Sequence, residues 1–479
     1  MDPEAVHSPT RWLAAHGVSV PDELVELEGW WASAGRAVSE AVDRMGTPWL
    51  RMFDRLGERT DEVLYPPEHR AMLLRGYRAG AVWHALEGEG LEATFRIGYV
   101  TSFFDPGAYC PYTVSLATAL AVHKYAEPAV RERFLPLLLR RDDGVWQGAT
   151  WMTESAGGSD LGAAVQTTAQ PEGERWRLRG EKFFASNVGA ELALVAARRP
   201  GAPRTVRGLN LFLVPRWSSD GRLNYRVRRL KDKVGTRSVP TGEVELLDSE
   251  AYLLGRPEDG VYHVLEVLNV SRVANAVGSA ALAQRALAEA VEFGRRRVAF
   301  GRPVLEHPLL RTQFQANLER VRAAFALAWY AVRLLEQVWQ EVPPYSARYH
   351  TFRLVTHLAK FWTAEVAFQS ARWCVDVHGG AGVLSEHGVE RLIREALILP
   401  IWEGTPHRQV LDGLEVMVQK GAHEALLDEL ARADPRRAEA LRERIRAHLE
   451  LPHEQREAHA DSLFAELASF TGAALTGQG

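Results

Sequence analysis

The sequence predicts an α+β fold, in which helical regions lie on both sides of a β region. In the first 145 residues, apolar residues recur at spacings of three and four, as in Leu116, Ala119 and Leu120. After residue 146 alternation with a period of two replaces this pattern, and after residue 257 the helical spacing returns. We therefore expect an N-terminal helical domain (1–145), a middle β-barrel or β-sandwich domain (146–256), a C-terminal helical region (257–420) and a helical extension (421–479).

The β region is predicted from several short runs separated by turn signals. Residues 176–183 and 225–230 alternate between polar and apolar side chains, whereas 192–197 and 209–215 are largely apolar and are typical of buried strands. Asp220-Gly221 is one of the turn signals between them. A β region of roughly 110 residues fits one small barrel or sandwich.

The helical regions that follow carry their own signals. Apolar residues from Val264 onward indicate one long helix running toward Arg297, and two more helices are expected around 308–340 and 350–376. In the extension, Asp434 is a good N-cap before Pro435. The apolar stripe that follows needs a partner, either the body of the protein or a second subunit; it consists of Leu441, Ile445 and Leu449.

Composition excludes several classes of function. The 479 residues are 46% hydrophobic and 25% charged, with a net charge of −4 and a pI near 6.5, so nothing indicates binding to nucleic acid or to an anionic membrane. Cys110 and Cys374 have no metal-ligand spacing, so no metal site and a reducing compartment are expected. With no apolar run of membrane-spanning length and no signal peptide, the sequence predicts a cytoplasmic enzyme.

One carboxylate stands out. Glu403 lies in a short connection between two helical patterns, directly after Trp402. Pro400 and Gly404 break the helical periodicity there. In such apolar surroundings desolvation raises the proton affinity of a carboxylate, which suits a general base near neutral pH. A satisfied glutamate at a helix end is the competing interpretation, and this segment alone does not decide between them.

Three further segments bear on that choice. They are a glycine turn at 377–382 (VHGGAG), a hydroxyl-rich and glycine-rich loop at 150–160 (TWMTESAGGSD) and the sequence RVAFGRP at 297–303. In this order, the four segments resemble the acyl-CoA dehydrogenase family over roughly residues 75–420. The resemblance implies an N-terminal helical domain, a β middle domain and a C-terminal four-helix bundle. It also implies an FAD enzyme that desaturates acyl-CoA thioesters.

The resemblance assigns the chemistry to Glu403. In the family the corresponding glutamate removes the α-proton while a hydride leaves the β-carbon for flavin N5. The thioester carbonyl is stabilised by the backbone amide of that glutamate and by a flavin ribityl hydroxyl. A relative, isovaleryl-CoA dehydrogenase, keeps its base on the long helix, at the position of Ser271 here, and serine cannot be the base. Trp402 and Arg272 are the residues expected at the substrate.

The resemblance also implies a set of flavin contacts. Thr153 and Ser159 correspond to residues that touch the flavin ring and the FAD pyrophosphate, and Ser186 to a hydroxyl near flavin N5. Phe184 stands where many members have a tryptophan that shields the flavin. Thr405, directly after the predicted base, corresponds to a further cofactor contact.

A second group of contacts would reach the FAD of a neighbouring subunit. Arg297 corresponds to an arginine on the FAD diphosphate, and its fixed distance to Phe300 favours this role over a solvated charge at a helix end. The corresponding loop under the adenosine contains Gly379, Gly380 and Gly382. These assignments predict a homodimer or homotetramer.

One branch of the family, the AidB-like flavoproteins, resembles the chain more closely. Its members bind FAD, have feeble dehydrogenase activity and bind DNA through a basic C-terminal domain. Here residues 421–479 contain seven Arg and no Lys against eleven Asp and Glu, a net charge of −4. Glu415 also stands where the branch pattern has an arginine. Such a tail opposes binding to phosphates, so DNA is not an expected partner.

Two main functions therefore remain. The first is an FAD acyl-CoA dehydrogenase for a short or branched acyl-CoA, because Trp402 replaces the usual tyrosine and narrows the pocket, with electron-transfer flavoprotein implied as acceptor. The second is an AidB-like, DNA-associated flavoprotein with vestigial catalysis. A flavin-binding scaffold without an acyl substrate is a third, blander possibility.

Overall fold

The computed structural model describes residues 3–476 and divides the chain into two compact units. The first unit, the bundle unit, comprises Met1–Glu28, Ser102–Pro106 and Arg272–Gly479; the second, the barrel unit, comprises Gly29–Thr101 and Gly107–Ser271. Residues 1–2 and 477–479, at the outer ends of the first and last predicted domains, lie outside the described residues. The boundaries expected at residues 145, 256 and 420 remain predictions.

The N-terminal region is mostly helical, as predicted. Its first helices are η1 (Pro3–His7), α1 (Pro9–Ala15), α2 (Asp22–Trp30), the π-helix η2 (Trp31–Gly35) and α3 (Arg36–Arg44). Those that follow are α4 (His69–Arg78), α5 (His84–Glu87), α6 (Leu91–Phe104), α7 (Pro106–Tyr125) and α8 (Pro128–Leu138).

The purely helical prediction for residues 1–145 is wrong at one place. An antiparallel hairpin of β1 (Trp49–Phe53) and β2 (Arg59–Leu64) interrupts the helices. The exposed positions of β1 include Trp49 and Phe53, which are 57% and 50% exposed, so its apolar residues do not mark the buried face as they do in a half-buried strand. Asp61 is buried and accepts a hydrogen bond from the main-chain N–H of Val227, which ties the hairpin to the barrel within the same unit.

The middle region is a closed, barrel-like sheet. Its strands are β3 (Gly148–Trp151), β4 (Thr168–Glu172), β5 (Arg175–Ser186), β6 (Leu192–Arg198), β7 (Leu209–Pro215), β8 (Arg226–Leu230) and β9 (Thr241–Leu254). The pairings run β6–β4–β5–β9–β7 and return to β6, while β3 adds to β6 and β8 to β9. Short helices α9 (Leu161–Ala164), η3 (Val206–Gly208) and η4 (Pro257–Asp259) lie between strands or after them.

The barrel core is formed by apolar side chains of the strands. Leu178 on β5 and Phe212 on β7 are fully buried, as is Trp151 on β3, whose indole N–H donates to the Ser186 carbonyl. Strands β6 and β7, which are largely apolar, are buried along their whole length. The strands carry the loop that follows β3, and this loop includes Thr153 and Ser159, two of the predicted flavin residues.

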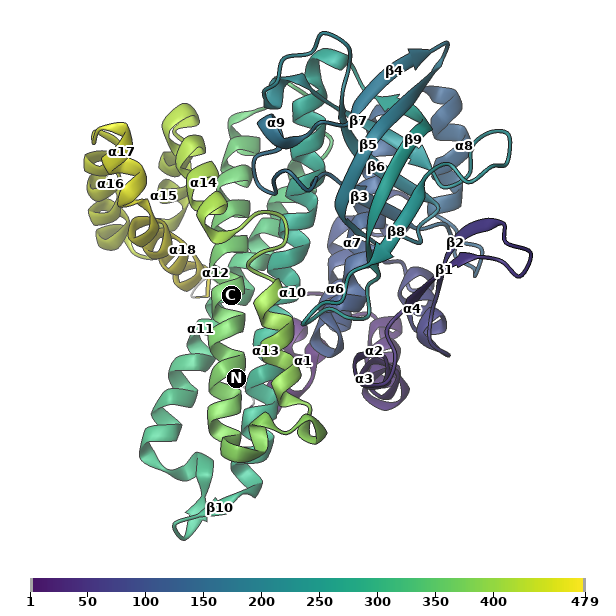
Figure 1. Ribbon diagram of the computed structural model, residues 1–479. Coiled ribbons are helices and arrows are strands. Elements are labelled where there is room, and N and C mark those ends of the chain that lie inside the picture. The colour runs from purple at the N-terminus through teal and green to yellow at the C-terminus, as the bar shows by residue number, and fades with distance from the viewer. Residues whose placement is uncertain (1–2, 477–479) are drawn as a thin grey trace. The chain divides into compact units, whose positions relative to one another are not determined.

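The bundle unit is built on long helices that run beside one another (Figure 1). They are α10 (Gly260–Arg296, which begins in the barrel unit), α11 (Pro308–Val338), α12 (Ala347–His378), α13 (Val389–Ile398) and α14 (Pro406–Lys420). Between them lie the small hairpin β10 (Val298–Ala299) and β11 (Arg302–Pro303) and the short helices η5 (Val304–Glu306), η6 (Gly379–Val383) and η7 (Ser385–His387).

The extension docks on the bundle of its own chain. It forms α15 (Ala422–Leu430), α16 (Pro435–Leu449), α17 (His453–Ala458) and α18 (Ala460–Thr476). Asp434 caps α16 as predicted, and the stripe residues Leu441 and Ile445 are buried where α16 packs on α15 and α18. Helix α18 packs on α11 so closely that a Cβ at Gly472 would lie 2.7 Å from the Ala323 carbonyl oxygen.

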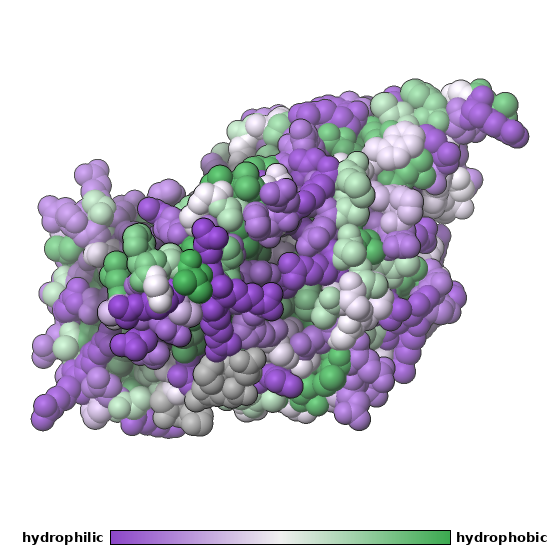
Figure 2. Space-filling view, turned by 90° about the horizontal axis from the view of Figure 1, so that it is seen from below, coloured by the Kyte–Doolittle hydropathy of each residue, from purple (hydrophilic) through white to green (hydrophobic). Residues whose placement is uncertain are grey.

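The molecular surface carries apolar residues in small areas. On the face shown in Figure 2, hydrophobic residues form separate patches among hydrophilic ones. Between residues 3 and 476, no helix is long and apolar enough to cross a membrane. In the same range, no group of three or more His, Cys, Asp or Glu side chains could hold a metal ion.

Candidate active site

Glu403 lies in the turn that connects α13 to α14, where the backbone is strained. Its φ is +57°, in the left-handed region that residues other than glycine rarely occupy, and Gly404 follows with φ +102°. Such a conformation costs about 1–3 kcal/mol and persists only where the surroundings impose it. The predicted position of Glu403 in a kinked connection thus agrees with the structure.

Side chains from two long helices hold this turn. Lys360 on α12 donates from Nζ to the carbonyl oxygens of Pro400 and Gly404, each at 2.5 Å. Arg272 on α10 donates from Nε to the Glu403 carbonyl at 3.1 Å. Both side chains are buried, with Lys360 fully inaccessible, so the turn rests on cations that solvent does not reach.

Helix α14 and a neighbouring amide complete the support. Gln409 Nε2 donates to the carbonyls of Glu403 and Gly404, both at 3.1 Å, and its Oε1 lies 2.9 Å from His357 Nδ1. Asn275 Nδ2 donates to the Leu399 carbonyl at 3.1 Å. The Glu403 carbonyl therefore accepts from two side chains, those of Arg272 and Gln409, which fix its peptide from two helices.

The electrostatics of Glu403 suit a general base. The side chain is half-buried, and burial raises its pKa, while the charges of Arg272 and then Lys360 act in the opposite direction. Burial in turn lowers the pKa of Lys360 to about 7. The hydrogen bonds that the described residues make to Glu403 reach its main-chain carbonyl and not its carboxylate, which can therefore meet a substrate.

The residues beside Glu403 have different surroundings. Trp402 is half-buried, and Ile401 is 59% exposed, so the turn presents an apolar surface next to the carboxylate. Thr405 is the N-cap of α14, and its hydroxyl oxygen accepts from the Arg408 main-chain N–H at 3.4 Å. Capping the helix uses only a lone pair of the hydroxyl oxygen, so the hydroxyl hydrogen can still be donated to a cofactor.

In the barrel unit, Thr153 and Ser159 belong to the loop that follows β3. Glu154 within this loop is buried and accepts from Lys182 Nζ at 2.7 Å and from the Thr167 hydroxyl at 2.6 Å. The Thr153 carbonyl accepts from the Phe183 main-chain N–H at 2.9 Å. Thr153 is half-buried and Ser159 exposed, so an anchored stem carries an open tip.

The other two flavin residues predicted in this unit lie on β5. Phe184 has 55% of its surface exposed, and Ser186 Oγ lies 3.1 Å from Thr241 Oγ1. Lys231 Nζ stands 4.6 Å from the centre of the Phe184 ring. An exposed aromatic ring with a cation at its face could pack on a planar ligand ring, which is the role the sequence predicted.

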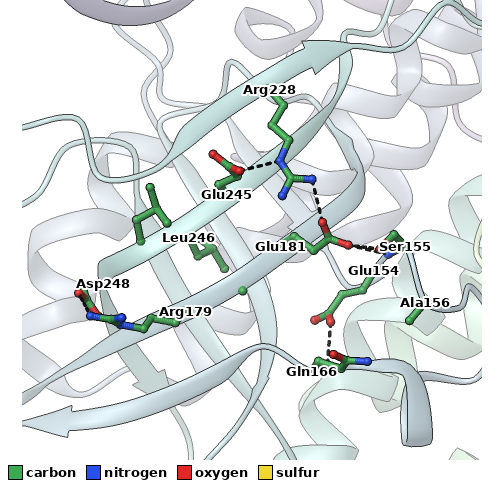
Figure 3. Close-up of a pocket in the computed structure, with 12 residues that line it drawn as sticks. Glu154, Ser155, Ala156, Gln166, Arg179, Glu181, Arg228, Glu245, Leu246 and Asp248 are labelled. Carbon is green, nitrogen blue, oxygen red and sulfur yellow. Dashed lines mark hydrogen bonds and ion pairs between the residues drawn. The ribbon is translucent and has the colours of Figure 1, made fainter.

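A pocket of about 660 Å³ opens on the barrel next to this loop (Figure 3). Glu154, Ser155, Ala156 and Gln166 line one part of it, and residues of β5, β8 and β9 line the rest. Figure 3 shows Arg228 between Glu181 and Glu245, to which it donates at 2.9 and 2.8 Å. None of the predicted site residues lines this pocket.

In the bundle unit, Arg297 and the glycine turn lie near one another. The ring of Phe293, near the end of α10, stacks on His378, the last residue of α12, with centroids 4.2 Å apart. Arg297 follows α10 and is exposed, while Gly379 follows His378 with φ +58°. A Cβ at Gly379 or Gly380 would meet nothing within 4 Å, so a ligand can approach this backbone closely.

Phe300 and Gly382 have distinct structural roles. Phe300 and Gly301 form the two-residue turn of the β10–β11 hairpin with φ values of +49° and +82°, and Phe300 is 96% exposed. By contrast, a Cβ at Gly382 would lie 2.7 Å from the Val375 carbonyl oxygen, so this glycine is needed for packing rather than for an open surface. That packing role was not predicted.

The structure thus places Glu403, Arg272, Trp402 and Thr405 at one turn of the bundle unit. Sequence reasoning missed the residues that hold this turn, namely Lys360, Gln409 and Asn275. One signal was available, because Lys360 stands beside Leu358 and Phe361 in the helix predicted around 350–376, and a lysine among apolar residues needs a partner if it is buried.

Comparisons with known proteins identify the family of the chain. The sequence model of the acyl-CoA dehydrogenase C-terminal domain matches residues 258–417, that of the middle domain matches 149–249, and that of the AidB N-terminal domain matches 11–143. The chain therefore belongs to the acyl-CoA dehydrogenase family, as the sequence analysis predicted.

Within the family the chain is similar to two curated relatives over most of its length. It is 29% identical to acyl-CoA dehydrogenase family member 11 of Caenorhabditis elegans, over 81% of this chain and 66% of the relative. It is also 29% identical to AidB of Escherichia coli, over 82% of this chain and 74% of that protein. With the AidB N-terminal match, these similarities confirm the AidB-like branch.

Solved structures share the fold. The apo form of Bd2924 has a TM-score of 0.86 at 27% identity, covering 99% of this chain and 95% of that one. ACDH-11 of Caenorhabditis elegans, solved in complex with C11-CoA, has a TM-score of 0.83 at 24% identity, covering 98% and 85%. Both extend over nearly all of this chain, and the predicted fold class is confirmed.

Proposed function

We propose that this protein is an FAD-dependent acyl-CoA dehydrogenase, in which Glu403 removes the α-proton of a short or branched acyl-CoA thioester. The observation that carries the proposal is the Glu403 turn itself. A strained backbone, fixed through its carbonyls by Lys360, Arg272 and Gln409, presents a carboxylate with a raised pKa beside an apolar surface. A satisfied helix-end glutamate would need none of this support.

The residues of the chain account for the proton-transfer half of the reaction. Glu403 takes the α-proton. Its raised pKa makes it a stronger base and so reduces the gap to the high pKa of the substrate's α-C–H group. The charges of Arg272 and Lys360 favour the ionised carboxylate and so act against the effect of burial on its pKa. Negative charge develops on the thioester oxygen, and the Glu403 main-chain amide is the donor that family membership supplies there.

Several features of the structure fit FAD. Gly379 and Gly380 leave open space above their backbone, Arg297 offers an exposed guanidinium for a diphosphate, and Phe184 offers an exposed ring. A bound FAD would supply the acceptor for the hydride that leaves the β-carbon. Electron-transfer flavoprotein is the acceptor that we propose for the reduced protein. A preparation that is colourless and gains no flavin absorbance on reconstitution would remove this part of the proposal.

The acyl chain length is the open part of the substrate assignment. The large ring of Trp402 beside Glu403 favours a short or branched chain, whereas ACDH-11 was solved with C11-CoA. Anaerobic titration with acyl-CoAs from C4 to C12 separates these cases, since the substrate bleaches the flavin. We expect C4–C5 thioesters to bleach it more readily than longer ones. A preference for long chains would contradict the role of Trp402.

The same titration tests the base. Glu403→Gln should retain FAD but lose bleaching by about 10²–10⁴-fold. Glu415→Gln is the matched control, because Glu415 is an exposed glutamate on α14 outside the site. Bleaching of Glu403→Gln at the wild-type rate, with the control unchanged, would overturn the proposal.

We propose further that the protein assembles as a homodimer or homotetramer. Arg297 and the glycine turn are assigned to a neighbour's FAD, so a monomer would leave that site incomplete. Several apolar side chains near Arg297 and the glycine turn are exposed in the single chain, and a second subunit could bury them. They are Val298, Phe300, Leu309, Val383 and Leu384. Light scattering that found a flavin-loaded monomer would contradict this assembly.

A DNA-associated role is the alternative, and the extension argues against it. Arg442 is held by Glu424, Asp428 and Glu439, so its charge is balanced within the extension. We expect duplex DNA to bind no more tightly than roughly 10⁻⁴–10⁻⁶ M at physiological salt. Tight binding with a steep salt dependence, together with no bleaching by any acyl-CoA, would favour the alternative.

A further inference from the structure

Lys360 is a lysine on α12 with no access to solvent, and both of its hydrogen bonds go to the turn that carries Glu403. Nζ contacts the carbonyl oxygens of Pro400 and Gly404, each at 2.5 Å. These two residues stand three before and one after Glu403, so a single amine ties both ends of the turn to one helix. Only a long side chain with at least two donors can do this from α12.

The position is costly for the fold. A buried ammonium loses its hydration, which two carbonyl oxygens replace only in part. Lys182 in the barrel has the same burial but also a carboxylate, Glu154, at 2.7 Å. At Lys360 the attraction that favours the charged form comes from Glu403, the residue that we assign as the base.

We propose that Lys360 is a positioning residue for the base: it fixes the strained turn so that the Glu403 carboxylate meets the substrate, and its charge favours the ionised carboxylate. This inference rests on the proposed role of Glu403. Its hydrogen-bonding part does not depend on protonation, because a neutral amine still carries the two hydrogens that the two carbonyls need.

An effect of charge on Glu403 can be attributed to Lys360, because few other groups around the turn change protonation in the same pH range as Lys360. Burial lowers the pKa of His357 to about 3, so this imidazole is neutral over the working pH range. The charged or titratable groups near the turn are Arg272 on α10, Arg353, His357 and Lys360 on α12, and Arg408 and Asp412 on α14. Lys360 bonds directly to carbonyls of the turn on both sides of Glu403.

Two substitutions separate position from charge. Lys360→Met removes the donors and the charge, whereas Lys360→Gln removes the charge but keeps an amide N–H donor group on a side chain that is one bond shorter. With the FAD-loaded protein and its best acyl-CoA, Lys360→Met should slow anaerobic bleaching by about 100-fold, with little change in acyl-CoA affinity. Lys360→Gln should recover part of that rate. In both variants the acid limb of the pH–rate profile should move to higher pH.

Controls make each outcome decisive. Lys420→Met, the same change at an exposed lysine on α14, should keep the wild-type rate and profile. Both Lys360 variants with the wild-type rate and acid limb would overturn the inference. If Lys360→Met does not accumulate as a flavoprotein, the acid limb of Lys360→Gln decides. If Glu403→Gln bleaches at the wild-type rate, the proposed function is refuted. If Glu403→Gln is inactive but both Lys360 variants keep the wild-type rate and acid limb, only this inference is refuted.

Discussion

Two loops of this protein that family resemblance assigns to its chemistry are each held by a fully buried lysine, yet the two lysines differ in what balances their charge. In the barrel, Lys182 donates to the Glu154 carboxylate at 2.7 Å and to the Ala196 carbonyl at 2.8 Å. In the bundle, Lys360 donates only to main-chain carbonyls, at Pro400 and Gly404.

The difference shows that a buried lysine holding a loop can act mainly on stability or mainly on a neighbouring catalytic group. Glu154 in the loop pairs with Lys182 on β5, so this ion pair stabilises the stem of the loop that carries Thr153 and Ser159. Lys360 lacks such a partner, and its charge acts on Glu403 instead. We therefore expect loss of Lys182 to appear mainly in stability and loss of Lys360 mainly in the chemistry.

The largest expected effect on stability is at Lys182. Lys182→Met leaves the Glu154 carboxylate buried without its cation, and breaking a buried pair from one side costs about 3–5 kcal/mol. Chemical denaturation followed by circular dichroism measures the loss, with Lys420→Met as the control at an exposed lysine. If Lys182→Met unfolds at the wild-type midpoint, the ion pair does not hold the loop.

The sequence predicted one side of this comparison better than the other. Pro400 and Gly404 broke a helical pattern around Glu403, and local signals of this kind survive in the folded structure. Lys360 lies 43 positions before Glu403 in the sequence, and its contact with the turn depends on how α12 faces α13 and α14, which periodicity does not determine. The hairpin β1–β2 was missed because exposed Trp49 and buried Asp61 reverse the usual pattern.

A smaller effect should appear in the pH dependence of stability. The folded-state pKa of Lys360, about 7, lies below its ordinary value of 10.5, so between these values the unfolded chain binds more protons than the folded one. Stability from this group therefore rises with pH in that window, by at most about 1.4 kcal/mol per unit. The difference in unfolding free energy between wild type and Lys360→Met, measured from pH 7 to 9, should increase. A difference that stays constant from pH 7 to 9 would mean that folding does not lower the pKa of Lys360.

The smallest effect is expected at His357. Its pKa of about 3 leaves it neutral when Glu403 titrates, so it contributes a hydrogen bond to Gln409 and no charge. His357→Asn should lower the bleaching rate only modestly and leave the acid limb in place. A shifted limb in this variant would show that the pH profile reports turn geometry in general, which would remove the distinction drawn for Lys360.

The central claim, that Glu403 is the base, can be tested without hydride transfer. In D₂O a base that takes the α-proton and returns a deuteron exchanges the α-hydrogens of a bound acyl-CoA analogue that cannot be oxidised. Mass spectrometry then gives the exchange rate. We predict exchange by wild type and by Glu415→Gln, and exchange slower by about 10²–10⁴-fold for Glu403→Gln with FAD still bound. Exchange at the wild-type rate in Glu403→Gln would contradict the assignment.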